Sequence, residues 1–162
     1  AMMLSQDGIE VGLAMCVAPD FHGFGNAEVF TAIRNLYRAG EPVDPVTVTD
    51  QLGTDGTAAK VGRTDGGGAK ERLMILQAQT PASANAEHYA RMMLDAADRR
   101  RLLDLGDDIM RAAADPTALI DEVADRSQAA FTELMNEKWG ARRQGTTDAP
   151  VKVLADGIKS EG

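Results

Sequence analysis

The sequence DFHGFGNAEVFTAIRNLYRAGEPVDPVTVTDQL, residues 20–52, says more about the fold than any other stretch of this chain. Its apolar residues between positions 29 and 37 recur at steps of one, three and four. This is the pattern of a helix that buries one face. Asn26 can cap the start of the helix and Gly40 can end it. We therefore predict a helix over residues 26–39.

The segment after this helix contains two prolines. Pro42 and Pro45 favour an extended connection, because proline restricts the backbone of the residue before it. Thr47, followed three residues later by Asp50, fits the capping box that begins a helix. The sequence thus predicts a second, short helix that ends near Gly53.

Residues 53–68, GTDGTAAKVGRTDGGG, form the most glycine-rich part of the chain. They contain six glycines and almost no large apolar side chains. Such a segment cannot bury enough apolar surface to become a rigid element. We predict a flexible surface loop here.

Helical spacing of apolar residues also occurs at residues 5–16 and 70–79. From residue 83, helix-compatible residues continue to 114, stop at Asp115-Pro116 and resume as far as Trp139. Two long helices joined by such a tight corner form an αα-hairpin.

Composition places the chain in the all-α class. Hydrophobic residues make up 44% of the 162 residues and aromatic residues only 4%, with eight methionines. This composition suits helices that pack through small and flexible side chains better than it suits a β-sandwich. We expect a compact helical head over residues 1–97, a hairpin over 98–139, a flexible linker over 140–150 and the start of a short linker helix over 151–162.

The charge balance argues against independent binding to nucleic acid. The chain has 17 Lys and Arg against 25 Asp and Glu, a formal net charge of -8, so a phosphate backbone would repel it. A single cysteine, Cys16, cannot form an internal disulfide. The sequence has neither a signal-peptide pattern nor an apolar stretch long enough to span a bilayer. We expect a cytoplasmic protein, and the apolar start at residues 1–4 is typical of a fragment cut from a longer chain.

The second hairpin helix carries an apolar stripe at heptad spacing. Ile120, Ala124, Ser127, Phe131 and Leu134 alternate steps of four and three, as in helices that pack side by side. Two helices alone form a thin structure that leaves apolar area in water. We predict that Ile120, Phe131 and Leu134 contact another subunit, and the alternative is that Phe131, Leu134 and Met135 form intramolecular core.

The last residues of the chain form a second candidate contact surface. Val151, Leu154, Ala155 and Ile158 lie at positions i, i+3, i+4 and i+7. A free helix shorter than about 12 to 15 residues is marginal in water. This segment therefore needs a partner surface in order to be ordered.

Candidate chemical motifs do not withstand inspection. Residues 62–70, GRTDGGGAK, have some features of a phosphate-binding P-loop, but Ala69 precedes Lys70, Glu71 follows it, and no strand comes before. A glycine-rich loop is the better interpretation. Two histidines, His22 and His88, and one cysteine are too few and too scattered for a structural zinc site.

Charged clusters on the hairpin have equally plain explanations. Asp107 and Asp108 both lie within helical reach of Arg111, which favours a solvated, salt-bridged face over a pair of catalytic carboxylates. The arginines at 99–101 could touch DNA, but adjacent helix positions point about 100° apart, so only one or two can share a face. We predict no catalytic, metal or cofactor site in this chain.

Four stretches together carry a family resemblance. They are residues 20–52, the opening AMMLSQDGIE, TPASANAEHYARMM at 80–93 and RRRLLDLGDDIMRAA at 99–113. In this order they resemble the N-terminal domain of bacterial replicative DNA helicases of the DnaB type. The chain departs from that family at His22 and Asn26, where the family has an aromatic residue and then a histidine.

The resemblance implies an oligomerisation domain without an active site of its own. In the family, the hairpins pair and three pairs close a collar above a hexameric ring of RecA-like ATPase domains. Primase, and possibly a helicase loader, binds the collar, whereas DNA, ATP and Mg belong to the ring of the parent helicase. The family's linker helix docks on the neighbouring subunit's ATPase domain, and Val151, Leu154 and Ile158 match that docking face in spacing.

Two alternatives stay open at this point. One is a free-standing or phage-encoded helicase-like adaptor that binds primase or a loader. The other is a helical DNA-binding regulator that uses the arginines at 99–101 together with Arg142 and Arg143. The regulator would show DNA affinity that falls steeply with salt, whereas the acidic total predicts almost none.

Overall fold

The described chain is helical throughout. The computed structural model describes residues 1–23, 25–62, 67–80 and 82–136, and these contain no strand. The predicted all-α class is confirmed. The chain divides into two compact units, the first of which is Ala1–Arg100. The boundary that the sequence predicts at residue 97 stays a prediction.

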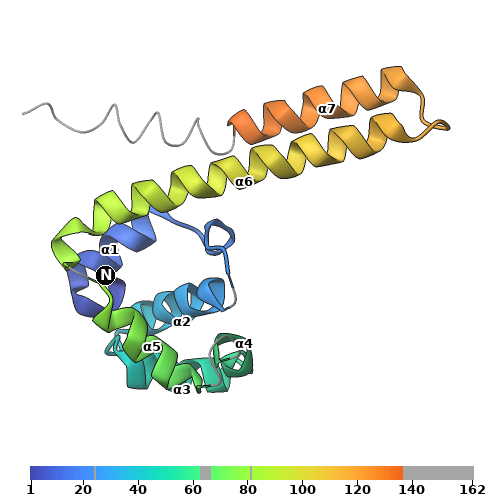
Figure 1. The fold of residues 1–162 in the computed structure, drawn as a ribbon. Helices are drawn as coiled ribbons and strands as arrows, with labels where there is room; N and C mark the ends of the chain where they lie inside the picture. The colour runs from blue at the N-terminus through green and yellow to red at the C-terminus, as the bar shows by residue number, and fades with distance from the viewer. Residues whose placement is uncertain (24, 63–66, 81, 137–162) are drawn as a thin grey trace, which may run out of the picture. The chain divides into compact units, whose positions relative to one another are not determined.

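Figure 1 shows the order of the helices along the chain. The first unit contains α1, α2, α3, α4, α5 and the first half of α6, and the second contains the rest of α6 and α7. Short 3-10 turns precede α1, α2 and α6. The bounds of the α-helices are Gln6–Met15, Asn26–Ala39, Pro45–Thr54, Ala58–Gly62, Ala69–Ala78, Ala86–Ala114 and Ile120–Leu134, and those of the 3-10 turns are Met2–Leu4, Ala18–Asp20 and Ser83–Asn85.

The larger hydrophobic cluster of the first unit lies between α2, α3, α4 and α5. Ala32, Val48, Leu52, Val61 and Leu73 each have a relative exposure of 0%. Each of these four helices therefore contributes at least one fully buried side chain. Full burial of one aliphatic side chain contributes roughly 1.5 to 3 kcal/mol, so this cluster holds the four helices together.

A second cluster packs a neighbouring side of α2 against α6. Phe30, Cys16, Ala90 and Leu94 are buried here. The ring of Phe21 lies 4.8 Å from that of Phe30, centroid to centroid, in a tilted arrangement. Aromatic pairs in this distance range add to the stability that burial alone provides.

A polar contact fixes the chain between α1 and α2 to α6. Asp20 has a relative exposure of only 1%, and its Oδ2 accepts a hydrogen bond of 2.7 Å from the backbone N–H of Val17. Arg100 donates from a guanidinium nitrogen to the backbone carbonyl of Asp20 at 2.7 Å. A buried carboxylate is tolerated when its oxygens are hydrogen-bonded, as this one is.

The start of α2 differs from the prediction that Asn26 caps it. The cap position is Gly25, which has φ 77° and makes no side-chain cap. Asn26 is the first helical residue, and its Nδ2 donates to the carbonyl of His22 at 2.7 Å. Its Oδ1 accepts a hydrogen bond from Arg72 at 3.3 Å. The predicted end of this helix at Gly40, with φ 74°, is confirmed.

Helix α3 begins earlier than the Thr47-Asp50 pair predicts. Its cap is Asp44, whose Oδ1 accepts from the N–H groups of Val46 and Thr47 at 2.7 and 3.1 Å. Thr47 Oγ1 accepts from the Asp44 N–H at 3.1 Å and completes a capping box. Pro45 is the first helical residue, where its missing N–H costs nothing. The capping-box motif is present, but three residues earlier than predicted.

The predicted loop at residues 53–68 is wrong in part, because it contains α4. The side chain of Val61 on this helix is fully buried. The prediction relied on the low apolar content of the whole segment and overlooked that one valine can dock a single turn. Residues 63–66 lie outside the described part.

The close approach of α4 to α2 explains why residue 25 is glycine. A Cβ at Gly25 would lie 2.6 Å from Val61 Cα and 2.8 Å from its Cγ2. Gly40 has a similar positive φ, but nothing lies within 4 Å of its would-be Cβ. Substitution of Gly40 therefore measures backbone strain alone, whereas substitution of Gly25 measures strain together with steric conflict.

We expect Gly40→Ala to lower the free energy of unfolding by about 1 kcal/mol, which is the cost of a left-handed conformation for alanine. Gly25→Ala carries the same strain and also displaces Val61, so it should cost about 2 kcal/mol more. Urea unfolding followed by circular dichroism measures both values. Equal losses for the two variants would mean that α4 does not pack against α2 in solution.

Asp44 and Asp50 variants test which residue caps α3. Asp44→Ala should lower the free energy of unfolding by about 1 kcal/mol, because two N–H groups lose their acceptor. Asp50→Ala removes an exposed carboxylate from the same helix and should change it by less than about 0.5 kcal/mol. Thermal unfolding of the two variants side by side measures the difference, and a larger loss for Asp50→Ala would restore the cap predicted at Thr47.

Candidate functional site

The hairpin is held together by a narrow seam. Helix α7 runs back, antiparallel, beside the part of α6 that follows Arg100 (Figure 1). Val123, with 5% exposure, is buried on α7, and Ser127, Ala130 and Leu134 on the same helical face are half-buried. Three residues of α6, namely Leu105, Ile109 and Ala112, are also half-buried at one face. We name these seven residues the seam.

The corner of the hairpin is closed by Asp115. Its Oδ1 accepts hydrogen bonds from Thr117 Oγ1 at 2.7 Å and from the Thr117 N–H at 2.8 Å. The side-chain hydrogen bond first, and the backbone one second, hold the pKa of the Asp115 carboxyl below its ordinary value. Ala118 N–H donates to the Asp115 carbonyl at 3.1 Å. An aspartate that bonds to the backbone two residues ahead is a frequent device for reversing the chain.

Several large apolar side chains of the hairpin face solvent. Leu103 is 69% exposed, Met110 64%, Ile120 65% and Phe131 47%. On α6, Leu103 and Met110 are seven residues apart, and on α7, Ile120 and Phe131 are eleven apart. Both spacings return to the same helical face to within about 20°. We name these four residues the apolar flank.

Met110 and Phe131, one from each helix of the hairpin, are expected on the same side of it. Met110 follows the seam residue Ile109 by one position, and Phe131 likewise follows Ala130. Each step of one residue is a rotation of about 100° in the same sense. Since the helices run in opposite directions, this rotation brings the exposed residues of both to one side. Leu103 lies eleven residues before the end of α6 and Phe131 lies eleven residues after the start of α7. The two residues are therefore at about the same distance from the corner along the hairpin.

The remaining exposed surface of the hairpin is mixed, because Leu102 and Leu119 are 38% and 65% exposed. The exposed acidic residues in its described part are Asp104, Asp107, Asp108, Asp115, Asp121, Glu122, Asp125 and Glu133. Arg111 bonds to Asp108 at 2.9 Å, as predicted for this salt-bridged face. Carboxylates thus adjoin the apolar flank, and one of them, Asp107, lies on the same face of α6 as Leu103 and Met110.

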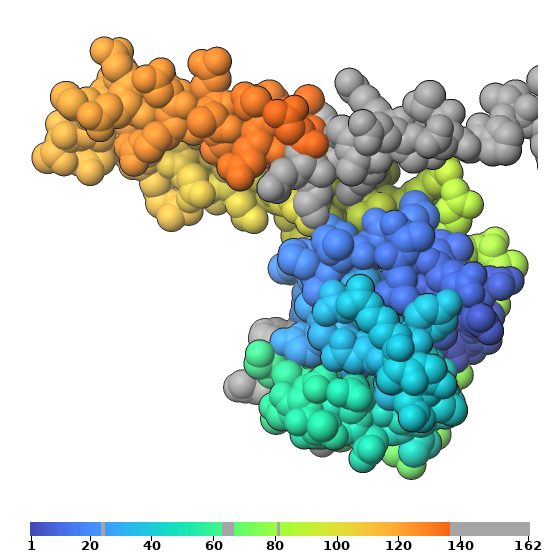
Figure 2. Space-filling view, turned by 180° about the vertical axis from the view of Figure 1, so that it is seen from behind, coloured from blue at the N-terminus to red at the C-terminus, as the bar shows by residue number. Residues whose placement is uncertain are grey.

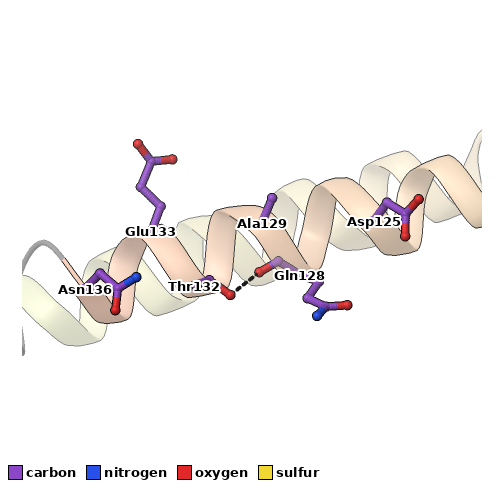
Figure 3. A pocket seen from close by; sticks show the side chains of 6 residues that line it. All are labelled: Asp125, Gln128, Ala129, Thr132, Glu133 and Asn136. Carbon is purple, nitrogen blue, oxygen red and sulfur yellow. Dashed lines mark hydrogen bonds between the residues drawn. The ribbon is translucent and has the colours of Figure 1, made fainter.

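The outer face of α7 also carries a shallow hollow. Figure 3 shows the side chains that border it, of which Asp125, Gln128, Thr132 and Glu133 belong to α7, and Asn136 follows it. Thr132 Oγ1 donates to the Gln128 carbonyl at 2.8 Å, a bond within the helix. Since the described lining comes from one helix and the residues after it, no second element converges on the hollow to build a binding site.

The predicted interface residues occupy two different environments. Ile120 and Phe131 are exposed on the apolar flank, whereas Leu134 is half-buried at the seam. The sequence stripe missed Val123 and Ala130, which make the seam, as well as Leu103 and Met110 on the first helix. The missed signal is the exposed apolar residue that directly follows a seam residue, as Met110 follows Ile109 and Phe131 follows Ala130. The predicted docking face at Val151, Leu154 and Ile158 lies outside the described residues, as does Trp139.

The other candidate residues are dispersed. Arg99 is exposed, whereas Arg100 is half-buried on the Asp20 carbonyl, so the arginine cluster does not form one basic face. His22 and His88 are both exposed and lie on different elements. Within the described ranges, no three His, Cys, Asp or Glu side chains are grouped as a metal would require. Over those same ranges, no helix has the length and apolarity needed to cross a membrane.

Comparison with known proteins agrees with this architecture. The family model described as DnaB-like helicase N terminal domain matches residues 1–95. The replicative DNA helicase DnaB of Mycobacterium leprae is 35% identical over 130 residues, which are 79% of this chain and 20% of that protein. That of Leifsonia xyli subsp. xyli is 31% identical over 128 residues, which are 79% of this chain and 27% of that protein.

A solved structure extends the likeness beyond the family match. The crystal structure of the N-terminal domain of DnaB helicase from Mycobacterium tuberculosis superimposes with a TM-score of 0.72 and 32% identity. The alignment covers 82% of this chain and 89% of that one. The chain spans about a quarter of the length of the curated relatives, 27% and 20%. This chain belongs to the DnaB-like helicase N-terminal domain family.

Proposed function

We propose that this domain pairs with a second copy of itself through the apolar flank, and that it serves as the oligomerisation domain of a hexameric replicative DNA helicase. The observation that carries the proposal is the apolar flank itself. Large apolar side chains, Met110 and Phe131 among them, lie exposed on a two-helix element whose described residues include one buried side chain, Val123 at 5% exposure. An element so thin needs a second surface to cover its apolar area.

The charge distribution supports pairing between identical copies. In a two-fold interface the same patch is used on both partners, so residues at its centre meet their own counterparts. An acidic patch would repel itself in this arrangement, whereas an apolar one does not. On α6, Asp107 lies four residues after Leu103 and three before Met110, so this carboxylate stands on the same helical face between them, whereas Asp121 on α7 lies about 100° around the helix from Ile120. Asp121 suits the polar rim that surrounds an interface core.

In the proposed assembly this chain provides geometry and not chemistry. Paired hairpins form a collar in the cytoplasm that fixes the positions of the ATPase domains and holds primase, or a loader, near emerging single-stranded DNA. ATP, Mg and DNA are bound by the parent ring, beyond the quarter of the relatives' length that this chain spans. Val151, Leu154 and Ile158 dock on the neighbouring subunit's ATPase domain. A free-standing or phage-encoded adaptor would differ from a helicase in its complete reading frame, because the frame of the adaptor would encode no P-loop.

We expect the chain to be a dimer or a larger assembly of dimers by multi-angle light scattering over a range of concentrations. Phe131→Ser should shift it to monomer, because the partner loses a buried aromatic anchor. Leu103→Ser should act in the same direction. Met92→Ser is the matched control, since Met92 is 59% exposed on α6 within the first unit.

Circular dichroism of each variant separates lost association from lost folding. The helical signal per residue should stay near that of the original chain in the Phe131→Ser monomer. A chain that is monomeric at every concentration, or a Phe131→Ser variant that keeps its dimer mass, would overturn the proposal.

A further inference from the structure

A second surface lies in the first unit and shares no residue with the apolar flank. A groove of about 420 Å³ separates the N-terminal turn and α1 from the end of α2 and the chain that follows it. In Figure 2 the dark-blue N-terminal segment and the cyan surface of residues near 40 lie next to each other here. We name it the N-terminal groove, and the side chains that define it are Met3, Leu4, Ile9, Tyr37, Glu41 and Val43.

The floor of the N-terminal groove is apolar and adaptable. Ile9 is buried, Met3 and Val43 are half-buried, and Leu4 is 41% exposed. Methionine has an unbranched, polarizable side chain that fills irregular shapes, and it is frequent on surfaces that accept varied partners. An apolar cavity of roughly 150 Å³ is enough to hold a benzene ring. The groove therefore has room for a large aliphatic or aromatic side chain.

The position of the N-terminal segment is fixed, so the groove is built and not incidental. Gln77 Nε2 on α5 donates to the carbonyl of Met3 at 3.1 Å. Ser5 Oγ accepts from the N–H of Gly8 at 3.1 Å and caps α1. On the opposite wall, the N–H of Glu41 donates to the Leu36 carbonyl at 3.0 Å and ends α2. Both walls are thus anchored by hydrogen bonds to the body of the first unit.

The rim of the N-terminal groove is negative. Glu41 is an exposed lining residue, and Glu10 is exposed one residue beyond the lining residue Ile9. Glu10 Oε1 accepts from Tyr37 Oη and from Gln6 Nε2, both at 3.1 Å. The hydrogen bond to Glu10, together with desolvation and the charge of Glu10, raises the pKa of Tyr37 above its ordinary value. Tyr37 therefore stays neutral and keeps its proton directed at this carboxylate.

The backbone strengthens this negative character. The last carbonyls of α2 end at the groove, and a helix C-terminus carries a partial negative charge, which Arg38 in the same turn partly offsets. The start of α1 would oppose it with a partial positive charge, but Asp7 stands in the first turn of that helix. None of the described residues that line the groove is Lys or Arg. The groove combines an apolar floor with an acidic rim.

We propose that the N-terminal groove binds a segment of a partner protein in which a large apolar side chain is flanked by Lys or Arg. The apolar side chain enters between Leu4 and Val43, and the cations lie over Glu41 and Glu10. Charge complementarity selects this partner over a second copy of the chain, whose total charge of -8 is of the same sign as the rim. The proposal goes beyond the proposed function and does not depend on the apolar flank.

The test uses a six-residue peptide with a central Phe-Leu pair, two Lys on each side and blocked ends, titrated into the ¹⁵N-labelled chain. We expect saturable shifts of the backbone amides of Leu4, Gln6, Tyr37 and Val43 in heteronuclear NMR spectra. A peptide with Glu in place of each Lys should produce none of these shifts.

Variants then assign the binding to the rim and the floor. Glu41→Lys should raise the Kd of the Lys peptide about fivefold, the size of one exposed ion pair turned into a like-charge contact. Leu4→Gln should raise it by about the same factor, because apolar contact area is lost. Glu133→Lys on α7 is the matched control, with the same change of net charge at another exposed site, and should leave the Kd within twofold.

Three results would overturn the proposal. The first is the absence of saturable shifts, and the second is equal weakening by Glu41→Lys and Glu133→Lys, which would indicate attraction to net charge alone. The third is a change in the mass of the Glu41→Lys chain by light scattering, which would make the groove a contact between copies. Loss of dimerisation in Phe131→Ser with peptide binding unchanged would separate this site from the apolar flank.

Discussion

Helix α2 is buried on two faces, and both hydrophobic clusters of the first unit are built on it. Ala32, Ile33 and Leu36 face the cluster shared with α3, α4 and α5, whereas Phe30 faces the cluster shared with α1 and α6. A helix that serves two clusters cannot rotate without exposing one of them. The positions of the surrounding helices are therefore coupled, and the two glycines at the ends of α2 set where the chain enters and leaves it.

Sequence periodicity was sufficient to locate the long helices. It was insufficient to locate the cap of α3 and the short helix α4, because these depend on neighbouring residues in the structure. The apolar spacing in residues 26–39 locates α2 correctly, because a half-buried helix repeats its pattern over several turns. The cap at Asp44 was missed because Thr47 and Asp50 offered a similar local motif, and only the hydrogen bonds distinguish the two. Helix α4 was missed because five residues are too few to show periodicity, and its single anchor, Val61, is defined by the groove into which it packs.

On the hairpin, sequence periodicity was likewise insufficient to predict which residues form the candidate site. The stripe of Ile120, Phe131 and Leu134 was read as one face, but a heptad pattern is also satisfied by residues that lie up to about 60° apart on a helix. The structure divides them between seam and flank, and it adds Leu103 and Met110 from a helix whose own sequence pattern gave no preference. Which residues of a two-helix element face solvent depends on the rotation of both helices about their axes, and this rotation is a property of the pair.

The seam combines three small side chains with Leu105, Ile109, Val123 and Leu134, and the Ser127 hydroxyl donates to the Val123 carbonyl within α7. Few atoms of the flank are needed for the fold of a single chain, so selection can change flank residues while the hairpin keeps its shape. Under the proposed pairing, a host helicase and a phage-encoded relative in one cell can diverge at these positions alone. Their subunits would then assemble separately, and mixed rings with mismatched motors would be avoided.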